Sequence, residues 1–219
     1  MLAETRRRLI WLSIFTVAMA QLEATVVVYL RELFYPGGFE CPLKIIRGSI
    51  VWIEVGREVS TVVMLVAIAK LAAPRDAWRQ FAAFLWAFGL WDILYYFWLW
   101  VMLDWPSSLL TTDVLFLIPA PWVGPCLAPM TIAAVMMGSG LVLESLRDRG
   151  RRVRVTRLEW GLTIGGALAL IGIFVLEAPA VIEGEMPGPF PWIWFLLLLA
   201  VPTAAAASAW RRSEREDDA

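Results

Sequence analysis

The chain has 219 residues and is 60% hydrophobic, whereas soluble domains are about 45–50% apolar, so an ordinary soluble domain is excluded and a membrane location is indicated. The net charge of −1 gives no indication of a nucleic-acid partner. The sequence contains no histidine, which excludes His-ligated haem, the usual copper sites, His-containing zinc sites and histidine acid–base catalysis.

Six apolar stretches have the length of a membrane-spanning helix, roughly 17–25 residues. They are separated by charged residues, prolines and glycines. They lie at about 9–30, 48–71, 80–103, 126–145, 158–177 and 191–210. The sequence therefore predicts an all-α integral membrane protein, with residues 1–219 forming one polytopic domain, a bundle of six transmembrane helices.

The first stretch has a second interpretation. Arginines at 6–8, an apolar segment and Ala18-Met19-Ala20 follow the pattern of a secretory signal with a cleavage site. The apolar stretch continues to Leu30, which a cleaved signal does not require. We expect an uncleaved first helix, and cleavage of residues 1–20 is the alternative.

Lysines and arginines are divided unequally between the two predicted sides of the membrane. One side carries fifteen lysines and arginines, which lie before the first stretch, after the sixth, at the end of the second and in the connection after it, and between the fourth and fifth. Six of these fifteen are the arginines of 147–157. Only Arg31, Lys44 and Arg47 lie on the other side. Because cytoplasmic loops carry the excess of basic residues, we expect both termini to be cytoplasmic and the protein to lie in the inner membrane. The arginines of 147–157 determine topology, contact anionic lipid headgroups, or do both.

Acidic side chains inside the predicted spans gather in the first three helices, and the last three contribute almost no such charge. At 1.5 Å per residue, Glu23 lies roughly 10 Å and Asp92 roughly 16 Å from the outer helix ends, with Glu54 and Glu58 at similar depth. Since a charge at the bilayer centre costs at least ~2.5–3.5 kcal/mol, these side chains should face the protein interior. The candidate ion- or ligand-binding residues are Glu23, Glu54, Arg57, Glu58, Asp92, Tyr95, Tyr96 and Asp113.

Two interpretations of this cluster are open. In the first, Arg57 forms ion pairs that hold three helices together. In the second, one arginine cannot neutralise four acids, so the remaining carboxyls are protonated, hydrated or bound to a cation. Such a cation would be hard, either Mg²⁺, Ca²⁺, Mn²⁺ or a monovalent ion, and protons alone would also suffice. No other cofactor is evident.

The outer connection 104–129 is rich in proline, with five in 26 residues. Its apolar core, 114–118, is too short to cross the membrane, which favours a re-entrant or interfacial segment. We expect a short helix there, with Thr112 or Asp113 as its N-cap. The connection forms either a lid over the acidic cluster, with Asp113 entering it, or an interfacial connector held by its tryptophans.

The two cysteines, Cys41 and Cys126, both fall on the predicted outer side. They either form a disulfide between the first and third outer loops or remain buried thiols. Glycines 161, 165, 166 and 172 in the fifth stretch, and less clearly 138 and 140 in the fourth, offer small-residue faces for close helix packing.

Three functions are compatible with these features. The leading one is cation- or proton-linked transport, in which the acidic cluster is the ion site. The main alternative is a small structural or assembly subunit of a larger membrane complex. A membrane enzyme acting on a lipid-like substrate is the third, although no nucleophile or metal-ligand motif supports it. The expected partners are the bilayer itself and either other membrane subunits or further copies of the chain.

Overall fold

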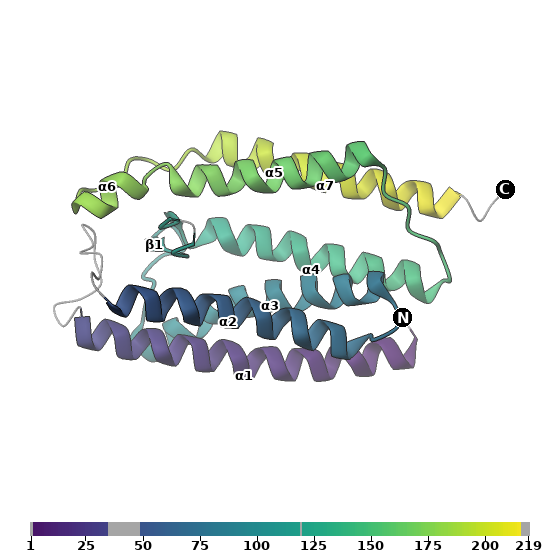
Figure 1. Ribbon diagram of the computed structural model, residues 1–219, viewed down its shortest axis with the longest axis horizontal. Coiled ribbons are helices and arrows are strands. Elements are labelled where there is room, and N and C mark those ends of the chain that lie inside the picture. The colour runs from purple at the N-terminus through teal and green to yellow at the C-terminus, as the bar shows by residue number, and fades with distance from the viewer. Residues whose placement is uncertain (1, 35–48, 119, 216–219) are drawn as a thin grey trace.

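The computed structural model describes residues 2–34, 49–118 and 120–215, and it is predominantly helical (Figure 1). Its elements in chain order are α1 (Ala3–Phe34), α2 (Ser49–Ala72), α3 (Ala77–Leu103), β1 (Thr112–Val114), β2 (Val123–Pro125), α4 (Leu127–Asp148), α5 (Arg157–Val175), α6 (Ala178–Glu183) and α7 (Trp192–Arg215). A helix therefore occupies each of the six predicted stretches.

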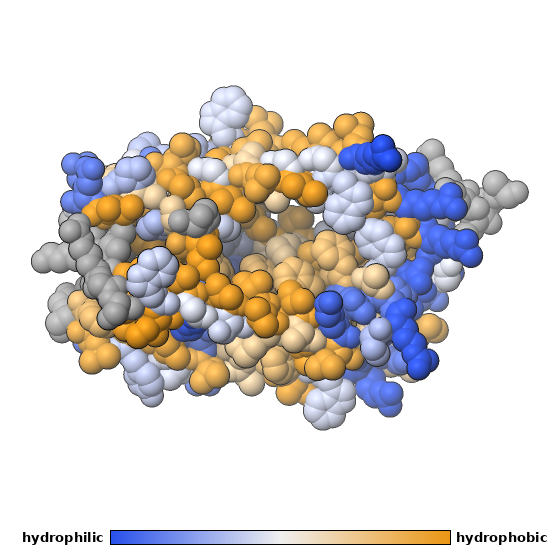
Figure 2. All heavy atoms as spheres, in the orientation of Figure 1, coloured by the Kyte–Doolittle hydropathy of each residue, from blue (hydrophilic) through white to orange (hydrophobic). Residues whose placement is uncertain are grey.

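The long helices run side by side along one axis (Figure 1). The central helix α3 packs against α1, α2 and α4, whereas α5 and α7 pack on each other and lie along the other side of α4. Helix α1 begins and α7 ends at the same end of the molecule, and β1 lies near the opposite end. Hydrophilic residues gather at the end where α1 begins (Figure 2), so we call it the basic end.

Among the residues that the structure describes, five helices are long and apolar enough to cross a membrane: α1, α3, α4, α7 and the segment Arg157–Glu183, which combines α5 and α6. Helix α2 is also 24 residues long, but it carries Glu54, Arg57 and Glu58. By length and composition the chain is a membrane-embedded helical protein. The prediction of six spans goes further than this finding.

Local capping residues explain where several helices begin and end. The Asp76 carboxylate accepts hydrogen bonds from the backbone amides of Trp78 and Arg79 at 3.0 and 3.2 Å, which starts α3. Thr156 and Glu159 form a reciprocal capping box at the start of α5. Helix α3 ends at Asp104, whose φ of 51° leaves the helical region.

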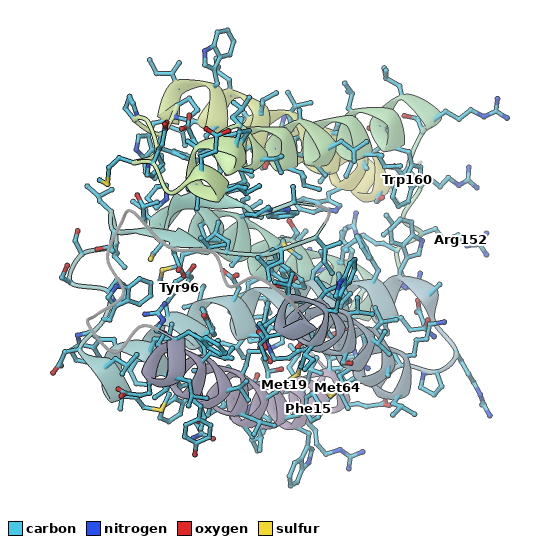
Figure 3. All side chains as sticks on the ribbon, turned by 60° about the vertical axis from the view of Figure 1, so that its left-hand side comes forward. Phe15, Met19, Met64, Tyr96, Arg152 and Trp160 are labelled. Carbon is cyan, nitrogen blue, oxygen red and sulfur yellow. The ribbon has the colours of Figure 1, made fainter. Side chains whose placement is uncertain are left out.

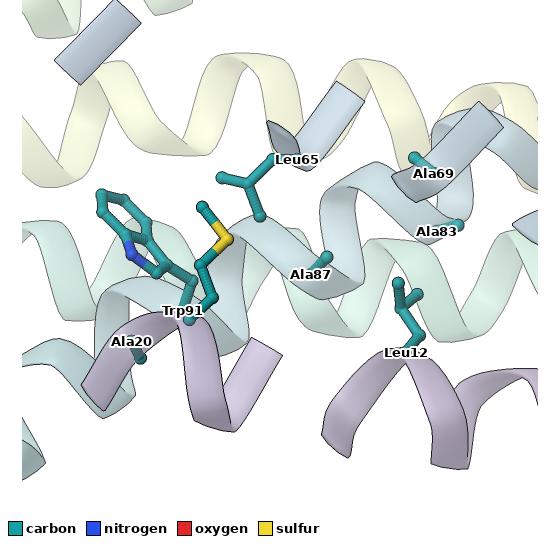
Figure 4. Packing of buried hydrophobic residues seen from close by; sticks show 8 residues of the cluster. Leu12, Ala20, Leu65, Ala69, Ala83, Ala87 and Trp91 are labelled. Carbon is teal, nitrogen blue, oxygen red and sulfur yellow. The ribbon is translucent and has the colours of Figure 1, made fainter. Parts of the chain in front are cut away.

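Small residues set the close approach of α3 to α4. A Cβ atom on Gly89 would lie 2.4 Å from the carbonyl oxygen of Ala133, and one on Gly140 would lie 2.8 Å from that of Ala82. Between α1, α2 and α3 the packing is formed by a mixture of small and large apolar side chains (Figure 4). That cluster includes Leu12, Met19, Ala20, Leu65, Ala69, Ala83, Ala87 and Trp91.

Fewer of the predicted glycines make close helix contacts than the sequence indicates. In the fifth stretch Gly166 packs closely, since its Cβ would lie 2.8 Å from Pro202 Cδ of α7. No described atom lies within 4 Å of an added Cβ at positions 161, 165 or 172, nor at 138 in α4. The close packing of α3 by Gly89 was not predicted.

The predicted helix in the outer connection is wrong, because Thr112 and Asp113 lie in a strand. β1 and β2 form an antiparallel hairpin in which Asp113 pairs with Gly124. Leu115 and Trp122 extend it, with the Leu115 amide donating to the Trp122 carbonyl at 2.8 Å. The Asp113 carboxylate accepts from the next amide, Val114, at 2.9 Å instead of capping a helix. Prolines on both sides of the strands disfavour helical backbone in the residues before them.

Candidate functional site

Arg57 joins α1 to α2 through two carboxylates. Its Nη1 forms an ion pair with Glu23 Oε1 of α1, and its Nε donates to Glu54 Oε2 at 2.8 Å. The hydroxyl of Thr61 donates to the other Glu23 oxygen at 3.1 Å. Glu23 and Glu54 are both buried. This part of the cluster is an ion-pair network, but it joins two helices and not the three that the first interpretation expects.

Glu58 is held in a different way, by the outer hairpin. The backbone amide of Leu117 donates to its two carboxylate oxygens at 3.1 and 3.0 Å. Leu117 lies between β1 and β2 in the chain, so the connecting segment of the hairpin reaches α2. The connection thus covers the acidic cluster from the outer end.

Asp113 lies at a second contact between the hairpin and the helices. It is 2% exposed, and its carboxylate accepts from the Tyr96 hydroxyl at 3.4 Å and lies 3.6 Å from Arg31 Nη2. The Arg31 guanidinium lies 3.7 Å from the centre of the Trp105 ring. Burial raises the pKa of Asp113 to about 6, and the charge of Arg31 and the hydrogen bonds to Asp113 only partly offset this effect.

A small cavity lies between α1, α2, α3, α4 and the hairpin. Its volume is about 90 Å³, and the polar residues lining it are Glu23, Arg57, Glu58, Asp92, Tyr95 and Tyr96. A water needs only roughly 10–15 Å³ of such space, so several waters or a hydrated ion would fit.

Asp92 is the least satisfied acid around this cavity. Its Oδ2 is buried and has no hydrogen-bond partner among the described residues. Trp91 and Trp122 line the same cavity, and their indole nitrogens are also buried without a hydrogen-bond partner among the described residues. A buried polar group without a partner is costly, so one acceptor and two donors are left unsatisfied in residues that line the cavity.

The predicted candidates are therefore close together. Six of the eight line the cavity, Glu54 joins them through Arg57, and Asp113 joins them through Tyr96. Helical spacing indicated this arrangement for Asp92, Tyr95 and Tyr96. Whether the cluster binds an ion or a ligand stays a prediction.

The predicted cation and disulfide also remain predictions. Within the described part of the chain, no group of three His, Cys, Asp or Glu side chains is placed to hold a metal ion. Cys126 is buried just before α4, and Cys41 lies outside the described residues.

A second ionic network, which the sequence analysis missed, lies at the basic end. Glu144 of α4 is fully buried, and its Oε2 lies 2.5 Å from Arg8 Nη2 and 2.6 Å from Arg79 Nη1. Asp148, one turn further, pairs with Arg79 at 2.9 Å and accepts from the Thr5 hydroxyl at 2.6 Å. The prediction concerned charge inside the predicted spans, and it did not identify this buried network near the end of α4. The i, i+4 spacing of the two acids was the available signal.

Comparison of the chain with models of known protein families, with curated proteins and with solved structures finds no match. The fold and the site therefore define the class directly. The chain is a multi-pass helical membrane protein with a small polar cavity lined by residues of α1 to α5 and of the hairpin.

Proposed function

We propose that this protein is an inner-membrane transporter whose transport is linked to a proton, with the cavity at Asp92 as the proton-binding site. The observation that carries the proposal is the buried, unpartnered oxygen of Asp92, a residue that lines the cavity. A carboxyl in such a place must be protonated, hydrated or bound to a cation. Structural ion pairing does not explain it, because Arg57 is already engaged by Glu23 and Glu54.

A proton is favoured over a metal ion by the size and chemistry of the cavity. At about 90 Å³ it has room for a few waters, and water molecules can relay protons between carboxyl and hydroxyl groups. Glu58, Asp92 and Tyr95 line it together. A larger cation such as Ca²⁺ takes six to eight oxygen ligands, and the described residues offer no cluster of three metal ligands.

The proposal includes a sixth span, α2. Its 24 residues extend roughly 36 Å at 1.5 Å per residue, which exceeds the ~30 Å hydrocarbon core. Its acids, Glu54 and Glu58, are 7% and 6% exposed, so they would face protein and not lipid. With the basic end in the cytoplasm, six spans place both termini on that side and the cavity toward the outer surface.

The test is proton flux into liposomes that contain the purified protein and a pH-sensitive dye. We expect Asp92→Asn to slow the flux by roughly a hundredfold, the lower end of what a positioned proton-transfer group contributes. The matched control is Glu177→Gln, which removes a carboxylate that accepts from the Gly188 amide at 2.8 Å, outside the cavity. Equal flux for Asp92→Asn and the wild type would contradict the proposal.

A structural or assembly subunit is the second candidate. The ion-pair networks favour it, since Arg57 joins α1 to α2 and Arg79 joins α3 to α4. This candidate expects no flux from the isolated wild-type protein and stable co-purification with other membrane subunits.

A further inference from the structure

An apolar groove separates the α5–α7 pair from α3 and α4. Its volume is about 280 Å³, and the molecule is visibly hollowed between these helices, with hydrophobic residues around the opening (Figure 2). The hydroxyl and carboxyl side chains in its wall are Ser139, Glu159, Thr163 and Thr203. Ser139 donates to the Val135 carbonyl at 2.7 Å and Thr203 to the Leu199 carbonyl at 2.8 Å, and the Glu159 carboxylate is paired with Arg212 at 2.5 Å. The groove therefore presents a carbon-rich wall.

The length of the groove corresponds to one leaflet of a bilayer. Along α4 it is lined from Ile132 to Leu143, a rise of roughly 16 Å at 1.5 Å per residue. On α3 its lining begins at Trp78, close to the basic end. Half of a ~30 Å hydrocarbon core is about 15 Å, so the groove reaches from the basic end to about the middle of the membrane.

The connection between α4 and α5 borders the groove at the basic end. Val153 and Val155 of this connection line the groove, whereas Arg152 between α4 and Val153 is exposed, as is Arg157 at the start of α5. Arg152 extends outward at the same end as Trp160 (Figure 3). The side chains of the connection that line the groove are thus apolar, and its exposed side chains include basic ones.

Two tryptophans at the basic end indicate where the membrane–water interface lies. The rings of Trp78 and Trp160 stack with centroids 6.5 Å apart and an interplanar angle of 17°, and both line the groove. Indole rings prefer the headgroup region of a bilayer. The basic surface therefore lies at headgroup level, and the groove lies at the level of the acyl chains.

We propose that this groove binds one acyl chain of an anionic phospholipid, whose phosphate lies against Arg152 and Arg157. The apolar wall, the one-leaflet length and the complementary charge together define this occupant. A neutral lipid satisfies the wall but not the arginines, and a helix from a second copy does not need them. Each basic residue near a membrane surface contributes roughly fivefold to the binding of an anionic lipid.

The first experiment uses the full-length protein in nanodiscs of phosphatidylcholine and phosphatidylglycerol. Native mass spectrometry after gentle release counts the lipids that each protein retains. We expect the wild type to retain one phosphatidylglycerol in preference to phosphatidylcholine. The surface variant R152Q/R157Q should lose this preference by roughly fivefold for each arginine, whereas Arg7→Gln, an exposed arginine of α1 at the same end, should keep it. Equal retention of both lipids by the wild type would overturn the proposal.

The second experiment fills the groove. Ala206 lines it, whereas Ala204 of the same helix is exposed outside it. We expect Ala206→Phe to lose the retained lipid and Ala204→Phe to keep it. Full lipid retention by Ala206→Phe, or a dimer of the wild type that this variant abolishes, would overturn the proposal. Because R152Q/R157Q changes only surface side chains, the proposal stays testable if Ala206→Phe does not fold.

Discussion

The acids of the outer cluster share the available arginines unequally. Glu23 and Glu54 both contact Arg57, and Asp113 lies near Arg31. Asp92 has a buried oxygen without a partner among the described residues. This inequality is the basis of the role that we propose for Asp92, and composition could not reveal it because the sequence does not say which acid each arginine reaches.

Asp76 offers a test of the basic end at the level of one side chain. It caps α3 and also accepts two hydrogen bonds from Arg147 at 2.9 and 2.7 Å. Partial burial raises its pKa, but the bonds from Arg147 and from the α3 amides outweigh this effect and hold the pKa below its ordinary value. The stabilisation is therefore present above the ordinary pKa, about 4, and is lost as the pH falls through the lower value of the folded protein.

We expect Asp76→Ala to lower the free energy of unfolding by about 1–2 kcal/mol, since it loses both the cap and the ion pair. Asp76→Asn keeps a capping oxygen and should lose less than about 1 kcal/mol. Denaturation of the detergent-solubilised protein at neutral pH measures both. The account is wrong if the two variants lose the same amount.

At the scale of elements, the helices were predictable and several of their ends were not. Apolar length located each helix, but the first span was predicted to end at 30, whereas α1 continues to Phe34 and brings Arg31 to Asp113. The fourth was predicted to end at 145, which left Glu144 at a boundary although it is fully buried. The hydropathy of a segment indicates whether it can lie in lipid, but it cannot reveal a buried charge that is neutralised by a side chain of another helix.

The outer hairpin could not have been predicted from its own sequence. Its strands are only three residues long, and contacts with distant elements hold it in place. Gly124 of β2 packs against α5, where an added Cβ would lie 3.0 Å from the Phe174 ring. Leu117 bonds to Glu58 of α2. Such long-range contacts carry no local signal in a proline-rich segment.

The approach of α3 to α4 yields a prediction with an internal control. Gly89→Ala places a methyl carbon 2.4 Å from the carbonyl oxygen of Ala133. We therefore expect the free energy of unfolding to fall by about 1–3 kcal/mol because of overpacking. Gly138→Ala meets no described atom within 4 Å and should gain up to about 1 kcal/mol from helix propensity. Thermal unfolding in one detergent measures both. Equal midpoints for the two variants would refute the assigned packing.

At the scale of the whole molecule, the two ends have different chemistry. The end that contains the hairpin encloses the small cavity of acids and aromatic residues. The basic end combines the buried network at Glu144 with the apolar groove between the helix pairs. Helices α1, α2 and α3 supply the charged and tyrosine residues of the cavity, and α5 with α7 supplies one wall of the groove. We therefore propose ion chemistry for α1 to α3 and lipid contact for the boundary between α3 and α4 and the α5–α7 pair.

The central claim is that Asp92 takes up and releases a proton within the folded protein. Infrared difference spectroscopy between acidic and neutral pH detects the carbonyl stretch of a protonated carboxyl directly. The wild type and Glu177→Gln should share a carboxyl band that Asp92→Asn lacks, with unfolding curves confirming that all three are folded. A spectrum for Asp92→Asn that is identical to the wild type would contradict the account, because the cavity carboxyl would then not exchange a proton.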